Sequence, residues 1–153
     1  MRLWRVSSVR LARDFTGGYG LTNSGRWNTP ARPITYCSTA PSLAALEKRV
    51  HARDPAVLPP LAVVEYDAPD DLPRREIGVA ALSADWTTRE IETQAIGDAW
   101  LDAITEALLY VPSVILPFAQ IPDRNLLINH RHPGSARITI ASLEPLNLDP
   151  RLF

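Results

Sequence analysis

The chain has 153 residues, a formal net charge of −1, 46% hydrophobic residues and 22% charged residues. These proportions are those of a globular domain that is long enough to bury one core. With so small a net charge, no field draws the whole molecule toward nucleic acid or an anionic membrane. The arginine-interrupted start predicts no signal peptide, and no apolar run approaches the roughly 20 residues that span a bilayer. The only cysteine, Cys37, cannot form an internal disulfide, which fits a reducing cytoplasm.

The first 40 residues predict two strands separated by a long loop. Residues 2–6 ("RLWRV") are typical of a strand, and residues 14–33 carry the glycine and asparagine turns of a loop. Residues 33–38 ("PITYCS") predict a second strand, in which Tyr36 and Ser38 share one face. If residues 26–28 pair with residues 34–36, Arg26 lies opposite Tyr36 as a cross-strand neighbour.

A helix follows over residues 38–54. Ser38 or Thr39 serves as its N-cap, Pro41 suits its first turn, and Asp54–Pro55 stops it. By helical spacing, Glu47 projects into the apolar stripe that Leu43, Leu46 and Val50 form. A carboxylate on that face is costly unless it is paired or used. Two interpretations stay open: a structural ion pair with Arg26 or Arg5, or a functional carboxylate.

The rest of the chain predicts short strands and one more helix. A strand is expected in residues 61–69, irregular structure with one short helix in 68–88, and one helix or a broken pair of helices in 88–110. Trp100, Leu101, Ile104 and Leu108 fall at helical spacing. Further strands are expected from Ser113 to residue 118, in 124–129 and in 136–148. Short strands mixed with helices, without regular alternation, predict a single α+β domain over residues 1–153.

Few of the usual catalytic or metal-binding patterns are present. The three histidines include one H-x-H pair, His130 and His132, without a cysteine or carboxylate at ligand spacing, so we expect no metal site. Cys37 lies in an apolar run and is expected to be a core residue rather than a nucleophile. No nucleophile elbow, P-loop or dinucleotide fingerprint occurs.

Four residues nevertheless have the chemistry of a site. Arg26 carries a fork suited to phosphate or carboxylate, Tyr36 an aromatic ring, Glu47 a carboxylate on an apolar face, and Ser113 a hydroxyl. Each also has a plain structural interpretation: a surface arginine, a sheet tyrosine, an ion-paired acid and a serine bonded to backbone. We expect the arginine, the aromatic ring and the acid to share a cleft.

The ordered set of motifs adds a resemblance. The stretches are "LWRV", "SGRWN", "ITYCS", "SLAALE", "IGDAWL", "ALLYVPSVILP", "NLLINHRHPGSARI" and "LNLDPRLF". Nearly end to end, the chain resembles the RES-domain toxins of the RES–Xre toxin–antitoxin systems. The arginine, glutamate and serine that name the family fall on Arg26, Glu47 and Ser113. The segment between Ser113 and Asn125 is a few residues longer than is usual, which leaves the position of Asn125 to the structure.

The resemblance implies a fold similar to ADP-ribosyltransferases, with a mixed sheet and flanking helices. It also implies an activity on NAD+ as a substrate, with no cofactor: cleavage of the nicotinamide–ribose bond, by hydrolysis or phosphorolysis, that depletes the cell of NAD and arrests growth. Glu47 would stabilise the oxocarbenium-like transition state, and Arg26 would clamp a phosphate. Ser113 would position the ribose or the carboxamide. The expected substrate-binding residues are Arg26, Tyr36, Trp27 and Asn125, with the Tyr36 ring against nicotinamide.

The implied partner is an Xre-like helix-turn-helix antitoxin in the cytoplasm, which would carry the DNA binding of the pair. The chain itself is expected to bind neither nucleic acid nor a membrane, and whether it forms a homo-oligomer stays open. Two alternatives to NAD+ degradation remain at this point. One is a protein ADP-ribosyltransferase that uses the same site, and the other is a non-catalytic binding module in which Glu47 is only a structural ion pair.

Overall fold

The fold is an α+β domain in the computed structural model, which describes residues 1–52, 58–149 and 151. In chain order its elements are β1 (Arg2–Ser8), the 3-10 helix η1 (Val9–Leu11), α1 (Tyr19–Thr22), β2 (Ile34–Ser38), α2 (Pro41–Val50), β3 (Leu61–Asp67), β4 (Arg74–Glu76), η3 (Val79–Ala81), α3 (Glu90–Ala103), β5 (Leu108–Val111), β6 (Asn125–Asn129), η4 (Pro133–Arg137) and β7 (Thr139–Leu146). The predicted fold class is confirmed. Within the described ranges no helix is long and apolar enough to cross a membrane.

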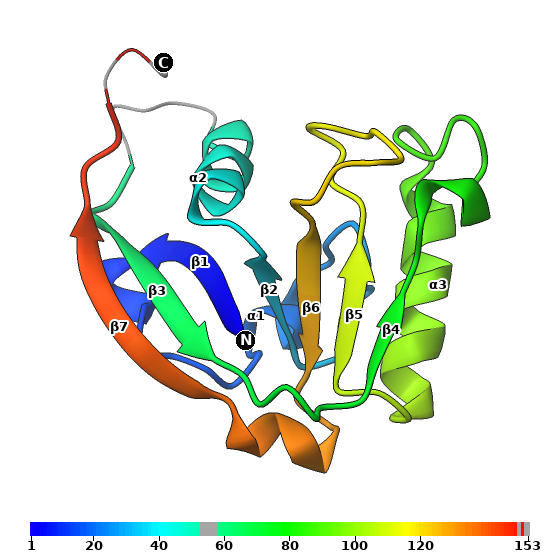
Figure 1. Ribbon diagram of the computed structural model, residues 1–153, viewed down its shortest axis with the longest axis horizontal. Helices are drawn as coiled ribbons and strands as arrows, with labels where there is room; N and C mark the ends of the chain where they lie inside the picture. Colours follow the sequence, from blue (N-terminus) through cyan, green and yellow to red (C-terminus); the bar gives the residue numbers. More distant parts are fainter. Residues whose placement is uncertain (53–57, 150, 152–153) are drawn as a thin grey trace.

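The strands form one seven-stranded mixed sheet in the order β4-β5-β6-β2-β1-β3-β7 (Figure 1). Only the β4–β5 pair is parallel, and the other neighbours run antiparallel. The register between β1 and β2 consists of a single pair, Trp4 with Ser38. The sheet is therefore made of two halves, β7-β3-β1 and β2-β6-β5-β4, that are joined at one point.

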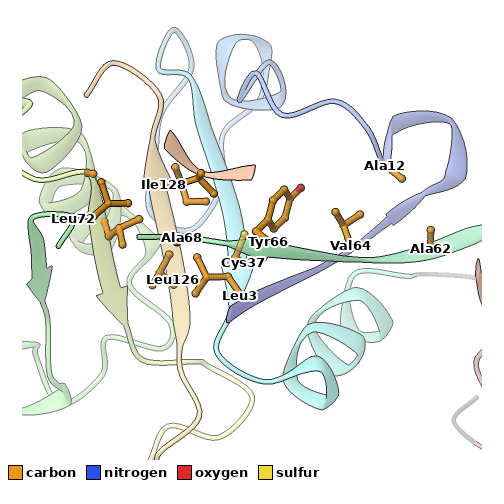
Figure 2. Close-up of a cluster of buried hydrophobic side chains, with 13 residues drawn as sticks. Leu3, Ala12, Cys37, Ala62, Val64, Tyr66, Ala68, Leu72, Leu126 and Ile128 are labelled. Carbon is orange, nitrogen blue, oxygen red and sulfur yellow. The ribbon is translucent and has the colours of Figure 1, made fainter. Parts of the chain in front are cut away.

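The two faces of the sheet bury separate hydrophobic clusters. Strand residues alternate between them, as the period of a β-strand requires: Cys37 and Leu126 face the first cluster, whereas Ile34 and Leu127 face the second. Figure 2 shows the first cluster, which gathers Leu3, Val64, Tyr66 and Ile128 around Cys37. The second cluster lies under α3 and includes Trp27, Ile77, Trp86, Trp100, Leu101, Leu109 and Val111. Tyr36 packs against this second cluster, so the predicted facing of β2 is confirmed.

Helix α3 ends earlier than the helical spacing predicts. Ile104 adopts a left-handed conformation with φ of 56°, which terminates the helix, and Leu108 starts strand β5 instead. Along the helix, Gly97 lies against the loop that precedes β2: a Cβ at this position would be 1.9 Å from the carbonyl oxygen of Trp27. The glycine therefore permits the close approach of helix and loop.

Several expected boundaries are wrong for identifiable reasons. The strand expected from Ser113 to residue 118 is wrong: these residues form no strand, and the preceding strand, β5, ends at Val111. Pro112 lacks the N–H that a central strand needs. Residues 26–28 do not pair with residues 34–36, because Gly25 bridges Asn28 within its own turn and β2 pairs with β1 and β6. Strand β4 was not expected, since its three residues are charged and exposed.

Helix α2 has no side-chain N-cap, contrary to the prediction. Its cap residue is Ala40, although Pro41 occupies the first turn as expected. Thr39 instead exchanges hydrogen bonds with the backbone of Arg124: its hydroxyl accepts from the nitrogen at 2.8 Å and its own N–H donates to the oxygen at 2.9 Å. The helix ends at Val50, and the expected stop at residues 54–55 lies outside the described residues.

Candidate functional site

Three strand ends meet at one edge of the sheet. Because β2 and β5 both run antiparallel to β6, the ends of β2 and β5 lie beside the start of β6, where Ser38 and Val111 both pair with Asn125. Helix α2 follows β2 closely, and Figure 1 shows it beyond that edge, near the loop that joins β5 to β6. This arrangement brings Glu47 of α2 to Ser113 and Asn125.

The Glu47 carboxylate is held at one of its oxygens. The Ser113 hydroxyl donates a hydrogen bond of 2.8 Å to Oε1, and the Asn125 side-chain amide donates a second, short bond to the same atom. Both donors are neutral. Oε2 accepts no hydrogen bond from any residue that the structure describes. One oxygen is thus held by two donors, whereas the other has no donor among the described residues.

Asn125 is itself oriented by β2. Its side-chain oxygen accepts a hydrogen bond of 2.9 Å from the Ser38 hydroxyl, and its amide nitrogen faces the Glu47 carboxylate, which can only accept. The longer segment after Ser113 does not displace Asn125, because the residue stays paired with Ser38 and Val111 in the sheet. Asn125 therefore belongs to the Glu47 site, as a residue that holds the carboxylate.

The ion pair considered for Glu47 does not form within the described ranges. Arg5 donates instead to the backbone oxygens of Leu11 and Asp14, at 3.1 and 3.0 Å, and lies 5.9 Å from the Tyr66 ring centre. Arg26 makes no salt bridge to any described residue. The carboxylate is thus stabilised by hydrogen bonds from neutral groups and not by a neighbouring cation.

Ser113 is buried, with 1% of its surface exposed. Its single hydroxyl hydrogen points at Glu47, and its oxygen also accepts a bond of 3.1 Å from the N–H of Ile115. The hydroxyl thus donates to Glu47 and accepts from the turn that follows β5. The predicted contact of Ser113 with a ribose or carboxamide stays a prediction.

Arg26 carries a positive charge that has no polar partner among the described residues. Its NH1 atom is buried and makes no hydrogen bond to the described part of the chain. A buried N–H group without an acceptor is costly, and a guanidinium can offer two parallel donors to a phosphate or carboxylate. Arg26 therefore has the properties of a residue that can bind an anionic ligand.

Tyr36 holds the turn that carries Arg26. Its hydroxyl donates to the Asn28 side-chain oxygen at 2.7 Å and accepts from the Trp27 N–H at 3.1 Å. Burial raises the pKa of this hydroxyl far above its ordinary value, so it stays protonated and is not an acid–base group. Gly25 passes so close that a Cβ there would be 2.6 Å from the hydroxyl oxygen. The half-buried ring leaves the predicted contact with nicotinamide as a prediction.

Trp27 does not offer its ring to a ligand. Only 2% of its surface is exposed, and its ring lies 6.5 Å from that of Trp86 in the cluster under α3. With its ring buried, the predicted contact of Trp27 with substrate stays a prediction. Its contribution is the backbone N–H that Tyr36 holds.

The structure thus contains two groups on the α3 side of the sheet. The first comprises Glu47, Ser113, Asn125 and Ser38, and the second Arg26, Tyr36 and Asn28. Strand β2 connects them, because Tyr36 and Ser38 are two residues apart and point to the same face. Each group therefore contains one residue of β2.

The remaining candidates have structural partners. His130 shares a hydrogen bond of 2.7 Å with the Thr35 hydroxyl, and His132 accepts one of 3.0 Å from the Gly134 N–H. The described residues contain no group of side chains that could hold a metal ion. Cys37 is buried, which raises the pKa of its thiol to about 12 and makes it a poor nucleophile.

Two surface hollows of about 460 Å³ each lie away from these groups. One is lined by Arg74, Arg75, Glu76, Tyr110, Pro122 and Arg124. The other is lined by Val9, Leu58, Pro59, Pro60, Leu61, Pro145, Leu146, Asn147 and Leu148. Neither includes Arg26 or Glu47, so the candidate site is defined by its chemistry rather than by these hollows.

Sequence reasoning missed two residues of the site. Ser38 was expected to cap α2, and its alternation with Tyr36 was the available sign that it faces the same side. Asn28 is completely buried and has three side-chain hydrogen bonds, to Asn23, Thr29 and Tyr36. Its place two residues after Arg26 in a glycine turn was the only signal in the sequence.

The described residues thus include a carboxylate that is held by neutral donors and an arginine without a polar partner among them. Residues 2–149 match the RES domain family, and the chain belongs to that family. A protein named Toxin Res from Pseudomonas putida is 36% identical over 157 residues, which cover 100% of each chain. A protein named Prs ADP-ribosylating toxin from a Sphingobium species is 31% identical, over 98% of this chain and 95% of that one.

The fold also resembles a solved structure. The crystal structure of the M. tuberculosis MbcT–MbcA toxin–antitoxin complex contains a chain that matches with a TM-score of 0.75. The match covers 95% of this chain and 84% of that chain, at 17% sequence identity. It shows that the two proteins share their fold.

Proposed function

We propose that this protein is the toxin of a toxin–antitoxin pair and that it cleaves the nicotinamide–ribose bond of NAD+. The observation that carries the proposal is the Glu47 carboxylate, fixed at Oε1 by Ser113 and Asn125 and without a partner at Oε2 among the described residues. The names of the relatives that match along the whole chain support the toxin assignment.

The proposed chemistry requires a negative charge beside the reacting ribose. As the bond between the ribose C1′ and the nicotinamide nitrogen breaks, the electron pair leaves with nicotinamide and positive charge develops on the ribose. A carboxylate whose donors are neutral keeps its full charge for that transition state. Oε2 of Glu47 would interact with the developing charge or a ribose hydroxyl, while Ser113 and Asn125 keep the carboxylate from rotating.

Arg26 would bind the pyrophosphate of the same substrate. Its buried NH1 has no acceptor within the described ranges, and a phosphate oxygen supplies one. Tyr36 would hold the Arg26 turn and present the open part of its ring to the nicotinamide. The acceptor, water or phosphate, then attacks C1′ and loses a proton to solvent.

A direct assay tests the proposal. Purified protein is mixed with NAD+, with and without inorganic phosphate, and nicotinamide and ribosyl products are separated by chromatography. We expect nicotinamide release that depends on Glu47, with ADP-ribose or its 1″-phosphate as the second product. Equal rates for the wild type and a Glu47→Gln variant would show that this carboxylate does not catalyse the reaction.

Protein ADP-ribosylation by the same site is the second candidate. It is favoured by the Sphingobium relative, whose name describes an ADP-ribosylating toxin. The two functions share the bond that breaks and differ in the acceptor. Incubation with labelled NAD+ and a candidate target such as Prs separates them, because only the transferase labels the protein.

The third interpretation is a binding module in which Glu47 forms a structural ion pair. The cationic partner that this pair requires is not found among the described residues. Neither Arg5 nor Arg26 forms a salt bridge with Glu47 in the described part of the chain. This interpretation forecasts no NAD+ turnover and a loss of stability when Glu47 is neutralised. The nicotinamide assay and a melting curve measure both.

We further propose that the partner is an Xre-like helix-turn-helix antitoxin and that the pair acts in the cytoplasm. The chain has a net charge of −1, so DNA affinity of the pair would reside in the partner. Co-expression with the adjacent reading frame, followed by operator binding at physiological salt, tests this division. Tight operator binding by the isolated toxin would contradict it.

A further inference from the structure

In the part of the chain that the structure describes, no hydrogen bond or ion pair fixes the position of the Arg26 guanidinium. It forms neither a hydrogen bond nor an ion pair with any residue in the described ranges, and its NH1 atom is buried without an acceptor. A side chain of this kind is placed by packing and by its own backbone. The orientation of the backbone at residue 26 therefore decides where the positive charge lies before a ligand arrives.

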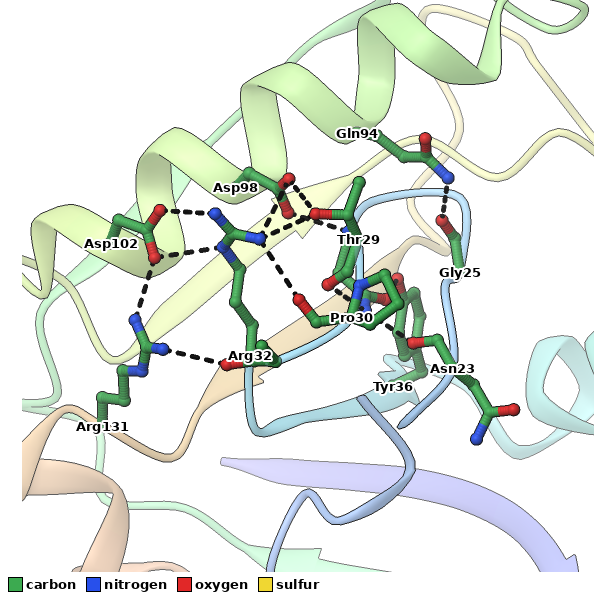
Figure 3. A network of polar contacts seen from close by, with 12 residues as sticks. Asn23, Gly25, Thr29, Pro30, Arg32, Tyr36, Gln94, Asp98, Asp102 and Arg131 are labelled. Atoms are coloured by element: carbon green, nitrogen blue, oxygen red, sulfur yellow. Dashed lines mark hydrogen bonds and ion pairs between the residues drawn. The ribbon is translucent and has the colours of Figure 1, made fainter. Parts of the chain in front are cut away.

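The backbone around Arg26 is held from outside by α3. The Gln94 side-chain amide donates to the carbonyl oxygen of Gly25 at 3.0 Å, and the Thr93 hydroxyl donates to that of Arg26 at 2.6 Å. One turn further, Asp98 accepts from Thr29, at 2.9 Å from the N–H and 2.6 Å from the hydroxyl. Figure 3 shows Gln94 above Gly25 and Asp98 above Thr29, with the loop lying along the helix.

These bonds fix both peptide units that flank the Arg26 Cα. A peptide unit is planar, so holding its oxygen or its N–H orients the whole unit. The unit after Arg26 is held at both ends: Thr93 donates to its oxygen, and its N–H, from Trp27, donates to the Tyr36 hydroxyl at 3.1 Å. The unit before Arg26 is held at its oxygen by Gln94. The two backbone dihedral angles of Arg26 are thereby set.

Thr93 is an unusual residue for its place in α3. It is 0% exposed, and a buried hydroxyl is costly unless it is bonded. Its oxygen lies 3.0 Å from the Glu90 carbonyl, but the contact to Arg26 is shorter and reaches across to a loop 67 positions away. A valine would have the same shape and fill the same space.

We propose that Thr93 and Gln94 are positioning residues that set the affinity of Arg26 for an anionic ligand. Their hydrogen bonds go to Arg26, Gly25 and Glu90, and not to Glu47 or its donors. Helix α3 thus serves as one arm of the site, although it supplies no group to the ligand. The identity of the ligand as NAD+ rests on the function proposed above, whereas the dependence on Arg26 does not.

The test compares Thr93→Val with Thr93→Ser, which keeps the hydroxyl. Binding of NAD+ and, separately, of inorganic pyrophosphate is measured by calorimetry. We expect Thr93→Val to weaken both by roughly three- to tenfold, the effect of one net hydrogen bond, and Thr93→Ser to restore most of the loss. Gln94→Ala, at a half-buried position, should shift both in the same direction by less, and it carries the test if Thr93→Val does not fold.

Thr35→Val is the matched control. Thr35 is also a buried threonine with one hydroxyl bond, to His130 at 2.7 Å, but it faces the opposite side of β2. It should lose similar stability and bind both ligands as the wild type does. In an Arg26→Ala background, studied at higher ligand concentration, Thr93→Val should cause no further loss of affinity, because its effect passes through Arg26.

The outcomes separate the two proposals. Unchanged pyrophosphate affinity in Thr93→Val, or an equal loss with and without Arg26, overturns the positioning role. Pyrophosphate binding that depends on Arg26 and Thr93 without any binding of NAD+ supports the positioning role and overturns the proposed substrate. A wild-type protein that binds neither ligand overturns both.

Discussion

Asn125 and Glu47 are 78 positions apart in the sequence, yet the amide of one donates directly to the carboxylate of the other. The amide is oriented because a carboxylate can only accept, so the amide nitrogen faces Glu47 and the amide oxygen accepts from the Ser38 hydroxyl. A neutral donor of fixed orientation stabilises a carboxylate without cancelling its charge. This is what distinguishes the Glu47 site from an ordinary ion pair, and it leads to the first two predictions.

Glu47→Gln should remove catalysis while keeping the fold. Because both donors bond to Oε1, a glutamine can place its own oxygen there and its NH₂ where Oε2 was. The shape survives and the negative charge is lost, so nicotinamide release should fall by roughly 100-fold or more, about 3 kcal/mol. NAD+ affinity and the melting temperature should change little. A variant that melts much earlier yet releases nicotinamide at the wild-type rate would refute the catalytic role.

Asn125→Asp should move the pH dependence of the reaction. The substitution replaces a neutral donor with a second carboxylate beside Glu47, and like charges at that distance disfavour ionisation of both. The acid limb of the rate profile should therefore shift to higher pH, and the rate at pH 7 should fall. The measurement is nicotinamide release from pH 5 to 9 for the wild type and the variant. Superimposable profiles would mean that Asn125 does not influence the working carboxylate.

Arg26→Lys should weaken substrate binding. A lysine keeps the charge but loses the planar fork that binds two phosphate oxygens at once. We expect KM for NAD+ to rise by roughly tenfold, with a smaller change in kcat. Arg75→Lys is the control, since Arg75 is exposed on β4 and belongs to neither group of the site. An equal effect of the two substitutions would remove Arg26 from the site.

Gly97→Ala should destabilise the protein. A methyl group at this position would lie 1.9 Å from the Trp27 oxygen, and because that atom belongs to the backbone, α3 and the loop must separate. We expect a loss of a few kcal/mol in unfolding free energy, measured by denaturant titration. Gly78→Ala is the control, because nothing lies within 4 Å of a Cβ there. A Gly97 variant as stable as the Gly78 variant would mean that the close approach is not as described.

The free energy of unfolding should decrease as the pH falls, partly because of His130. Burial and, to a smaller degree, Arg5 lower the pKa of His130 to about 4, from its ordinary value of 6.5, against an opposing effect of Asp14. Between these values the unfolded chain binds a proton that the folded chain does not, so unfolding becomes more favourable as pH falls from 6.5 toward 4. His130→Gln should flatten this part of a plot of melting temperature against pH. Parallel plots for the two proteins would contradict the shifted pKa.

Much of the fold followed from local patterns, and the errors have local causes. The alternation in residues 34–38 predicted correctly which face Tyr36 occupies. The three-residue β4 has no apolar pattern of its own and exists because its backbone pairs with β5. The strand expected after Pro112 is wrong because an apolar run does not show where a strand ends. In this run the strand, β5, ends at Val111.

The site was partly within reach of sequence reasoning. Glu47 stood out as an acid on an apolar face, and Arg26 and Ser113 stood out by their chemistry. The resemblance added Asn125. That the donors to Glu47 are neutral depends on how β2, β5 and β6 pair, which no spacing encodes. Likewise, nothing near Thr93 in the sequence indicates that its hydroxyl reaches a loop 67 positions earlier.

Because β1 and β2 share a single register pair, the hydrogen bonds of the Glu47 site connect the two halves of the sheet. Helix α2 packs mainly on β1, in one half of the sheet, while Ser113 and Asn125 belong to strands of the other half. The two hydrogen bonds to Glu47 therefore add links between the two halves of the sheet, beside the backbone pair of Trp4 and Ser38. A ligand that contacts both Arg26 and Glu47 should stabilise the association of the two halves. A partner protein that binds the state in which the halves are separated would remove the donors from Glu47, and so inactivate the carboxylate without contacting it.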